Sequence, residues 1–444
     1  MHKNHPLFLS NYLKNYAGSG ALRAHMPGHK GRALPECGLP ADAYAWDITE
    51  IAGADSLFEA DGILRRSEER TAAVYGSPAC CWSAGGSTLC IQAMLARMRA
   101  QGRVVVAART VHRAFLNACI LLGLEVRWVF PRSGGIISGE YAPEDFAEAI
   151  RQVRRTGAQA CVYVTSPDYL GNQQDITELA RLCHAQDAPL LVDNAHGAHL
   201  PFLPENRHPM ALGADYCCDS AHKLLPALTG AAILHCRRPE EVPLLKSDMQ
   251  MFGSTSPSYL IMQSLESCTA YLETRGREEI PRCAQRADAL RQELSGKYRF
   301  IGTEPLHLTI AVDGHDLAAQ LRALGVECEY EDAGFLVLLL SPVMTEAEFA
   351  QLSRALRQCT PKPPRPVPVL PPPMSAACDM RTAALSAWER VPLARAEGRI
   401  CGPVQVPCPP AVPIAVSGEV LTREWLDLMG EYGLETAACM VEKG

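Results

Sequence analysis

The sequence lacks several features that mark specialised classes of protein. It has 18 cysteines in 444 residues but no Cys-x-x-Cys pair. It has no apolar run of about 18 residues, and its first residues lack the apolar core of a signal peptide. Positive charge is not in excess, because the net charge is −7. We therefore expect a cytoplasmic protein with reduced thiols, and neither nucleic acid nor membrane as a partner.

The composition is that of an ordinary globular protein, with 48% hydrophobic and 20% charged residues. The length is too great for one core, so several domains are expected. Between residues 104 and 235, short apolar runs alternate with amphipathic stretches. We predict strands at 104–108, 125–130, 160–164, 190–193 and 231–235, and helices at 113–122, 143–156 and 175–186. This alternation predicts an α/β domain with a mostly parallel sheet, whose ligands bind at the carboxyl ends of the strands.

The second half of the chain has a different pattern. Alternating segments at 306–312, 326–330 and 335–340, with helices at 316–324 and 346–358, predict a small α+β domain. Eight prolines in thirteen positions make 361–373 a stiff connector. The first residues form a helical arm with Leu7, Phe8, Tyr12 and Tyr16, expected to pack on another domain or subunit. The predicted parts are an arm (1–20), a large domain (21–260), a small domain (261–360), the connector (361–373) and a C-terminal domain (374–444).

Two segments carry the chemistry. The apolar run Leu190-Leu-Val ends in Asp193, and a Ser220-Ala-His-Lys223 turn follows later in the chain. Many pyridoxal-phosphate (PLP) enzymes place a lysine and a carboxylate at opposite ends of one ring in this way. The lysine forms an imine with the aldehyde, and the carboxylate keeps the ring nitrogen protonated. The spacing therefore favours a PLP enzyme.

A second turn fits the same hypothesis. Gly85-Gly-Ser-Thr88 precedes Ile91, Met94, Leu95 and Met98, which fall on one helical face. Amides at the start of such a helix can bind a phosphate. A plain Ser or Thr cap is the commoner explanation of the same pattern.

With these motifs in order, the chain resembles the Orn/Lys/Arg decarboxylase family in its short form. The likeness rests on motifs that span almost the whole chain. They are Met26-Pro-Gly-His-Lys-Gly31, Gly86-Ser-Thr88, Arg109-Thr-Val-His-Arg113, Ser166-Pro-Asp-Tyr-Leu-Gly171, Asp193-Asn-Ala-His-Gly-Ala-His199, Ser220-Ala-His-Lys223, Thr255-Ser-Pro-Ser-Tyr259, Glu397-Gly-Arg-Ile400 and Ser417-Gly-Glu419. The chain has Gly85, Cys90, Asn194 and Gly230 where the family usually has other residues, glutamate in the case of Asn194.

The resemblance implies a fold type I, aspartate aminotransferase-like large domain and PLP-dependent decarboxylation of arginine, lysine or ornithine, giving a polyamine or its precursor. It implies that Lys223 is the imine lysine, that Asp193 pairs with the ring nitrogen and that His112 stacks on the ring. His196 is then a neighbour of the ring. The implied phosphate and active-site contacts are Ser87, Thr88, Ser220 and His222, with Thr255 and Ser256 from the other subunit. A homodimer, or a dimer of dimers, with shared active sites is expected.

Other readings remain open from the sequence. Another fold type I activity (aminotransferase, aldolase or desulfurase) and a catalytically silent PLP-binding homologue both fit the motifs. A metal site built from His196, His199 and His222 is disfavoured, because their spacing is poor for one helical face, and no metal is expected. Asp168 has two candidate roles, contact with substrate or capping of a turn.

Overall fold

The computed structural model describes residues 7–36, 38–404, 406 and 411–441, so the first six residues of the predicted arm lie outside it. The chain forms two compact units. The first unit contains residues 1–97, 194–283 and 341–343, and the second contains 98–193, 284–340 and 344–444. The domain boundaries expected from the sequence stay a prediction.

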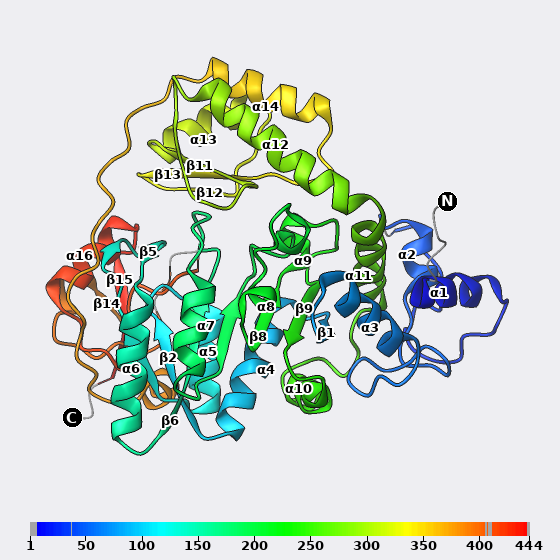
Figure 1. Ribbon diagram of the computed structural model, residues 1–444, viewed down its shortest axis with the longest axis horizontal. Coiled ribbons are helices and arrows are strands. Elements are labelled where there is room, and N and C mark those ends of the chain that lie inside the picture. Colours follow the sequence, from blue (N-terminus) through cyan, green and yellow to red (C-terminus); the bar gives the residue numbers. More distant parts are fainter. Residues whose placement is uncertain (1–6, 37, 405, 407–410, 442–444) are drawn as a thin grey trace. The chain divides into compact units, whose positions relative to one another are not determined.

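Helices and three strands make up the first unit (Figure 1). Its elements are α1 (Phe8–Gly18), α2 (Ala41–Trp46), α3 (Ile63–Tyr75), β1 (Ala79–Ser83), most of α4 (Gly86–Ala100), α8 (Pro209–Leu212), β8 (Tyr216–Asp219), α9 (Ala221–Leu224), β9 (Ala232–Cys236), α10 (Val242–Gln250), α11 (Tyr259–Tyr271) and the start of α12 (Arg277–Leu294). A π-helical turn, Leu272–Gly276, joins α11 to α12.

The second unit contains the parallel strands, the small sheet and the C-terminal elements. Its first part has β2 (Arg103–Ala108), α5 (Arg113–Leu122), β3 (Val126–Val129), β4 (Ser133–Gly134), β5 (Gly139–Glu140), α6 (Pro143–Arg155), β6 (Gln159–Thr165), α7 (Ile176–His184) and β7 (Leu190–Asp193). Its later part has β10 (Arg299–Ile301), β11 (His307–Ala311), α13 (Gly314–Ala323), β12 (Tyr330–Glu331), β13 (Phe335–Leu339), α14 (Glu346–Gln358), α15 (Met380–Leu385), β14 (Trp388–Pro392), α16 (Arg423–Glu431) and β15 (Thr436–Met440).

The central sheet has seven strands in the order β1-β9-β8-β7-β6-β2-β3. In the second unit β7, β6, β2 and β3 run parallel. In the first unit β9 pairs antiparallel with both β1 and β8. The predicted α/β class with a mostly parallel sheet is confirmed. Residues 160–164 of β6 and 190–192 of β7 are all buried and apolar, as expected for strands covered on both faces. Helices α6 and α7 pack side by side (Figure 1).

Local sequence signals set several helix boundaries. The His112 side chain caps α5 at its start, and Gly123 ends it in the left-handed region, with φ 62°. Thr345 and Glu348 form the predicted capping box of α14. Helix α6 begins at Pro143, a position where the missing proline N–H breaks no hydrogen bond of the helix. Acidic residues in its first turn and basic residues in its last turn interact favourably with the helix dipole.

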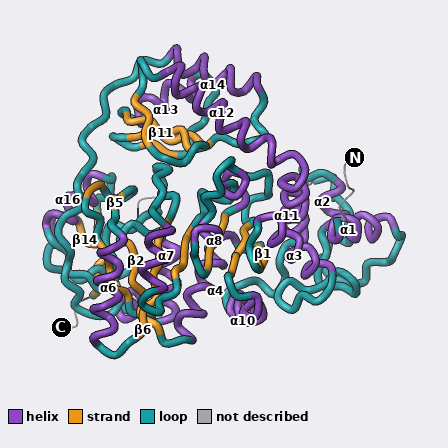
Figure 2. The backbone as a smooth tube through the Cα atoms, viewed as in Figure 1, coloured by secondary structure: helices purple, strands orange, loops and turns teal. Residues whose placement is uncertain are grey.

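The small sheet of the second unit has the order β10-β11-β13-β12. Figure 2 shows α13 and α14 on the same side of this sheet. The predicted strand at 326–330 is largely wrong, because only Tyr330 and Glu331 pair with β13. Gly325 turns the chain with φ 75° after α13, and ladder pairing begins only once the chain has come back alongside β13.

Two leucines form the buried face of helix α1 in the N-terminal arm. Leu9 and Leu13 are fully buried, whereas Phe8, Tyr12 and Tyr16 are partly exposed. Helix α1 packs on α3 and α11 within the first unit. The Glu266 carboxylate accepts the amides of Leu9 and Ser10 at 2.9 and 2.8 Å, which satisfies two of the donors that a helix start leaves open.

The C-terminal elements pack onto the end of β2. Arg109, 1% exposed, donates to the carbonyls of Pro413 and Ile414 at 3.0 and 2.8 Å and lies 3.8 Å from the Glu419 carboxylate. Its guanidinium also lies over the rings of two tryptophans, Trp128 and Trp425. This arginine therefore fixes the 413–419 segment next to the loop that carries His112.

No helix in the described ranges is long and apolar enough to cross a membrane.

Candidate active site

An amine and an imidazole meet in the first unit. Strand β8 ends at Asp219, and the short helix α9 that follows carries Lys223. The Lys223 Nζ atom lies 2.8 Å from Nε2 of His196, a residue that is only 4% exposed. A lysine amine in this contact can exchange a proton with the imidazole, since both groups titrate and they share one hydrogen bond.

Asp193 is the last residue of β7, and three residues further along the chain is His196. Its carboxylate is 2% exposed and accepts a hydrogen bond from the Tyr163 hydroxyl at 3.2 Å. The Tyr163 ring is itself buried against Phe115, with 4.3 Å between the ring centroids. The carboxylate is therefore held in one orientation at the carboxyl end of the strand, where ligands of parallel sheets bind.

Two hydroxyl groups meet where α4 begins. Ser220 Oγ donates to Ser87 Oγ at 2.9 Å. The Gly86 amide donates to the Gly230 carbonyl at 2.8 Å, so it is not available to a ligand. Ser87 and Thr88 follow in the first turn, where amides have no acceptor inside the helix. Gly230 has φ +94°, which explains glycine at a position where the family usually has a side chain.

The two other histidines of the predicted site hold backbone groups. His112 Nδ1 accepts the Ala114 amide at 3.1 Å. His222 Nδ1 lies 3.1 Å from the Ala231 carbonyl and donates to it. Thr255 and Ser256 lie in the loop between α10 and α11 and are exposed.

A buried polar cluster lies directly before the lysine turn. Asp219 Oδ2 lies 3.1 Å from His208 Nε2 and 3.2 Å from His235 Nε2. The Asn194 amide donates to Asp219 Oδ1 at 2.7 Å. Although burial raises the pKa of Asp219, His208 and His235 hold it well below its usual range. A glutamate at position 194 would place a second carboxylate next to Asp219, and the asparagine amide avoids that repulsion.

Comparison with known proteins decides the family. Residues 6–313 match the family described as Orn/Lys/Arg decarboxylase, major domain. The chain belongs to the Orn/Lys/Arg decarboxylase family. An arginine decarboxylase of Halalkalibacterium halodurans is 27% identical over 454 residues, covering 94% of this chain and 91% of that protein. Lysine decarboxylase A from Pseudomonas aeruginosa has a TM-score of 0.83 at 18% identity, covering 98% of this chain and 80% of that chain. A structure of SPT with PLP has a TM-score of 0.55 at 14% identity, covering 69% and 80%.

Membership confirms the predicted reaction and cofactor. This decarboxylase uses PLP and acts on a basic amino acid. The structural matches confirm the fold type I class.

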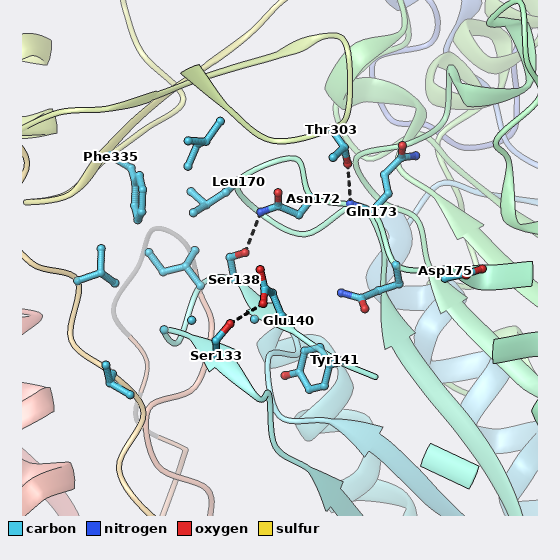
Figure 3. A pocket seen from close by; sticks show the side chains of 18 residues that line it. Ser133, Ser138, Glu140, Tyr141, Leu170, Asn172, Gln173, Asp175, Thr303 and Phe335 are labelled. Atoms are coloured by element: carbon cyan, nitrogen blue, oxygen red, sulfur yellow. Dashed lines mark hydrogen bonds between the residues drawn. The ribbon is translucent and has the colours of Figure 1, made fainter. Parts of the chain in front are cut away.

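The second unit of this decarboxylase also contains a pocket of about 500 Å³ (Figure 3). Its walls come from the β4–β5 hairpin, the segment 170–175, the connector and the small sheet; within the described ranges, none of the predicted site residues lines it. Asp168, next to this pocket, accepts the amides of Leu170 and Asn172, both at 2.9 Å, and the Ser138 hydroxyl. These contacts favour the turn-capping role over the substrate role.

Sequence reasoning missed several residues of the site. Tyr163 gives no signal, because a tyrosine inside an apolar strand is usually core. Asp219 does give one, as a charged residue that ends the apolar run Tyr216-Cys-Cys. Its partners His208 and His235 come from separate segments and only the fold brings them together.

Proposed function

We propose that this family member decarboxylates arginine, with Lys223 as the residue that carries the cofactor and His196 as its proton partner. The observation that carries the proposal is the 2.8 Å contact between Lys223 Nζ and His196 Nε2, in a turn that follows the strand ending in Asp193 along the chain. The choice of arginine is supported by relatives named arginine decarboxylase, which match 93–95% of this chain.

The residues fit PLP chemically. When bound, PLP supplies an aldehyde that bonds to amines and a ring that accepts the electrons of the broken bond. Lys223 offers the amine. The buried Asp193 carboxylate, oriented by Tyr163, suits a protonated ring nitrogen, because a buried anion needs a positive or donating partner. The hydroxyls of Ser87 and Ser220, together with the start of α4, suit a phosphate.

The remaining predicted residues take supporting roles in this proposal. Thr88 would add a first-turn group beside Ser87, and His222 would contact the phosphate. His112, held as the cap of α5, would lie against the ring. Thr255 and Ser256 would contact the phosphate of a second copy in a homodimer or dimer of dimers, which is compatible with their exposure.

The chain's own residues move the proton. Decarboxylation replaces the carboxylate on the substrate carbon with a proton, which an acid of the protein would have to supply. Lys223 can donate it and be reprotonated by His196, which lies within hydrogen-bond distance. An acid placed in this way typically contributes about 10²–10⁴-fold to the rate.

The test is a panel of basic amino acids with identification of the product. Wild-type protein loaded with PLP is expected to release carbon dioxide and the corresponding amine from arginine faster than from lysine or ornithine. Transfer of the amino group without carbon dioxide would instead identify an aminotransferase. Binding of PLP with no turnover of any of the three would identify a silent homologue and refute the proposal.

Two variants test the assignment of residues. Lys223→Ala is expected to lose the visible absorbance of bound PLP together with all activity. His196→Gln is expected to keep the absorbance but lower kcat about 10²-fold or more. Lys297→Ala is the control, since this lysine is exposed, donates to the Arg357 carbonyl and is none of the predicted site residues. Full absorbance in Lys223→Ala would exclude this lysine.

We also propose a cytoplasmic location, as the sequence predicts. The described part of the chain contains 16 cysteines outside disulfide bonds, and 14 of them are buried. Free thiols in this number are typical of a reducing compartment.

A further inference from the structure

The buried cluster before the lysine turn contains groups that this reaction does not use. Cys217 and Asp219 alternate on β8 and therefore face the same side of the sheet. His235 lies opposite Cys217 on β9, and His208 comes from the loop before α8. Cys217, Asp219 and His235 are 0% exposed and His208 is 1% exposed. The fold therefore brings a thiol, a carboxylate and two imidazoles together away from water.

The donor atoms have the spacing of a metal site. His208 Nε2 lies 3.3 Å from Asp219 Oδ1 and 3.8 Å from Cys217 Sγ, and Cys217 Sγ lies 3.6 Å from Asp219 Oδ1. With Zn–N and Zn–O bonds of about 2.1 Å and a Zn–S bond of about 2.3 Å, tetrahedral donors lie about 3.4 Å apart, or about 3.6 Å when one is sulfur. The three atoms therefore match one face of a tetrahedron around zinc.

Two neighbouring side chains, His235 and Asn194, form hydrogen bonds with the Asp219 carboxylate and fix its orientation. His235 Nε2 contacts the second carboxylate oxygen at 3.2 Å, and Asn194 donates to the first at 2.7 Å. In metal sites, hydrogen bonds from neighbouring side chains to the metal-binding residues orient those residues. His235 is itself fully buried, so the carboxylate oxygen that it contacts is held by a side chain with little freedom to move.

A tyrosine whose ring lies beside the cluster carries a buried hydroxyl. The Tyr75 ring packs against the rings of His208 and His235, with centroid distances of 5.8 and 4.8 Å. Its hydroxyl is buried and has no hydrogen-bond partner among the residues that the structure describes. Buried polar groups without a partner are rare and usually indicate a water or an ion that occupies the space beside them.

We propose that His208, Cys217 and Asp219 bind a zinc ion, with a water molecule in the fourth position facing Tyr75. On binding, the Cys217 thiol loses its proton to solvent and its sulfur bonds to the ion, while His208 binds through its unprotonated Nε2. The ion is structural: it ties the loop before α8 to β8 and thereby supports the turn that carries Lys223. The rival explanation is that no ion binds, and that the Asp219 carboxylate accepts hydrogen bonds from the side chains of Asn194, His208, Cys217 and His235.

Metal analysis of the holoenzyme tests the proposal directly. Protein produced with zinc in the medium and purified without a metal-affinity tag is expected to contain about one zinc per chain. Protein produced with cobalt instead is expected to show the visible bands of tetrahedral Co²⁺ and a thiolate-to-cobalt band in a difference spectrum against the zinc form, which cancels the PLP absorbance. Less than about a tenth of an equivalent of zinc, with no cobalt bands, would overturn the proposal.

Matched variants identify the ligands. Cys217→Ser is expected to lose the thiolate-to-cobalt band and most of the metal. Cys218→Ser is the control, because it is the neighbouring buried cysteine of the same strand and faces the other side of the sheet. Equal loss of metal in both variants would refute the assignment. His208→Gln serves as an independent ligand variant if Cys217→Ser does not fold, and retention of full metal by it would also refute the site.

Discussion

Replacing Arg109 by methionine should destabilise the protein more than any exposed arginine change. The substitution leaves the Glu419 carboxylate buried without its cation and the carbonyls of Pro413 and Ile414 without their donor. Breaking a buried ion pair by removing one partner typically lowers the free energy of unfolding by about 3–5 kcal/mol. We expect a loss of that size in urea unfolding followed by intrinsic fluorescence at fixed PLP concentration.

The effect should depend on pH in a defined direction. Burial raises the pKa of Glu419, and Arg109 opposes that rise. Without Arg109, the pKa of Glu419 in the folded variant lies further above its pKa in the unfolded chain. Between these two pKa values the folded protein binds a proton that the unfolded chain has released. The free energy of unfolding of the variant therefore falls as pH rises through the folded-state pKa. The deficit relative to wild type should therefore be smaller at about pH 5.5 than at about pH 8.

Two comparisons separate this explanation from general damage. Arg127→Met removes an exposed arginine that lies 2.6 Å from Glu125, and it should change stability by less than about 1 kcal/mol. Adding Glu419→Gln to Arg109→Met should recover part of the loss, because no buried charge remains. A deficit below about 1 kcal/mol for Arg109→Met, or the same deficit at both pH values, would show the reasoning to be wrong.

Three further changes test other contacts. Tyr163→Phe removes the hydroxyl donated to Asp193 and should weaken PLP binding about 5–10-fold in a fluorescence titration; unchanged affinity would mean that this hydrogen bond does not support the cofactor. Glu266→Gln replaces one acceptor oxygen of the α1 cap with a donor and should make the arm more sensitive to limited proteolysis, whereas equal cleavage rates would count against the cap. Gly230→Ala should lower stability by about 1–2 kcal/mol because φ is +94°; Gly296→Ala, in open space, is the neutral control.

The sequence was most informative where local signals were complete. Helix α5 has the predicted bounds because His112 and Gly123 mark both of its ends. The capping box at Thr345 fixed the start of α14 in the same way. Strand β7 was predictable because an apolar run ends abruptly at Asp193. In each case the determining residues lie within a few positions of one another.

Features that depend on pairing across the chain were missed. Strands β1 and β8 are short and were not predicted, because their pairing with β9 rather than their own pattern defines them. The buried face of α1, which carries Leu9 and Leu13, was not predicted for a similar reason, since Glu266 and the neighbouring helices orient it. In the site, the lysine and the aspartate were readable from motifs. The contact of Lys223 with His196 and the cluster around Asp219 required the folded chain.

The contact between Asn194 and Asp219 has an evolutionary consequence. Each side chain is compatible with the other, but a glutamate at 194 would meet an anion that already has its donors. Restoring the common family residue at this single position should therefore be harmful here, and harmless only when the residue at 219 is neutralised first. We therefore expect the effects of substitutions at 194 and 219 on stability to be non-additive.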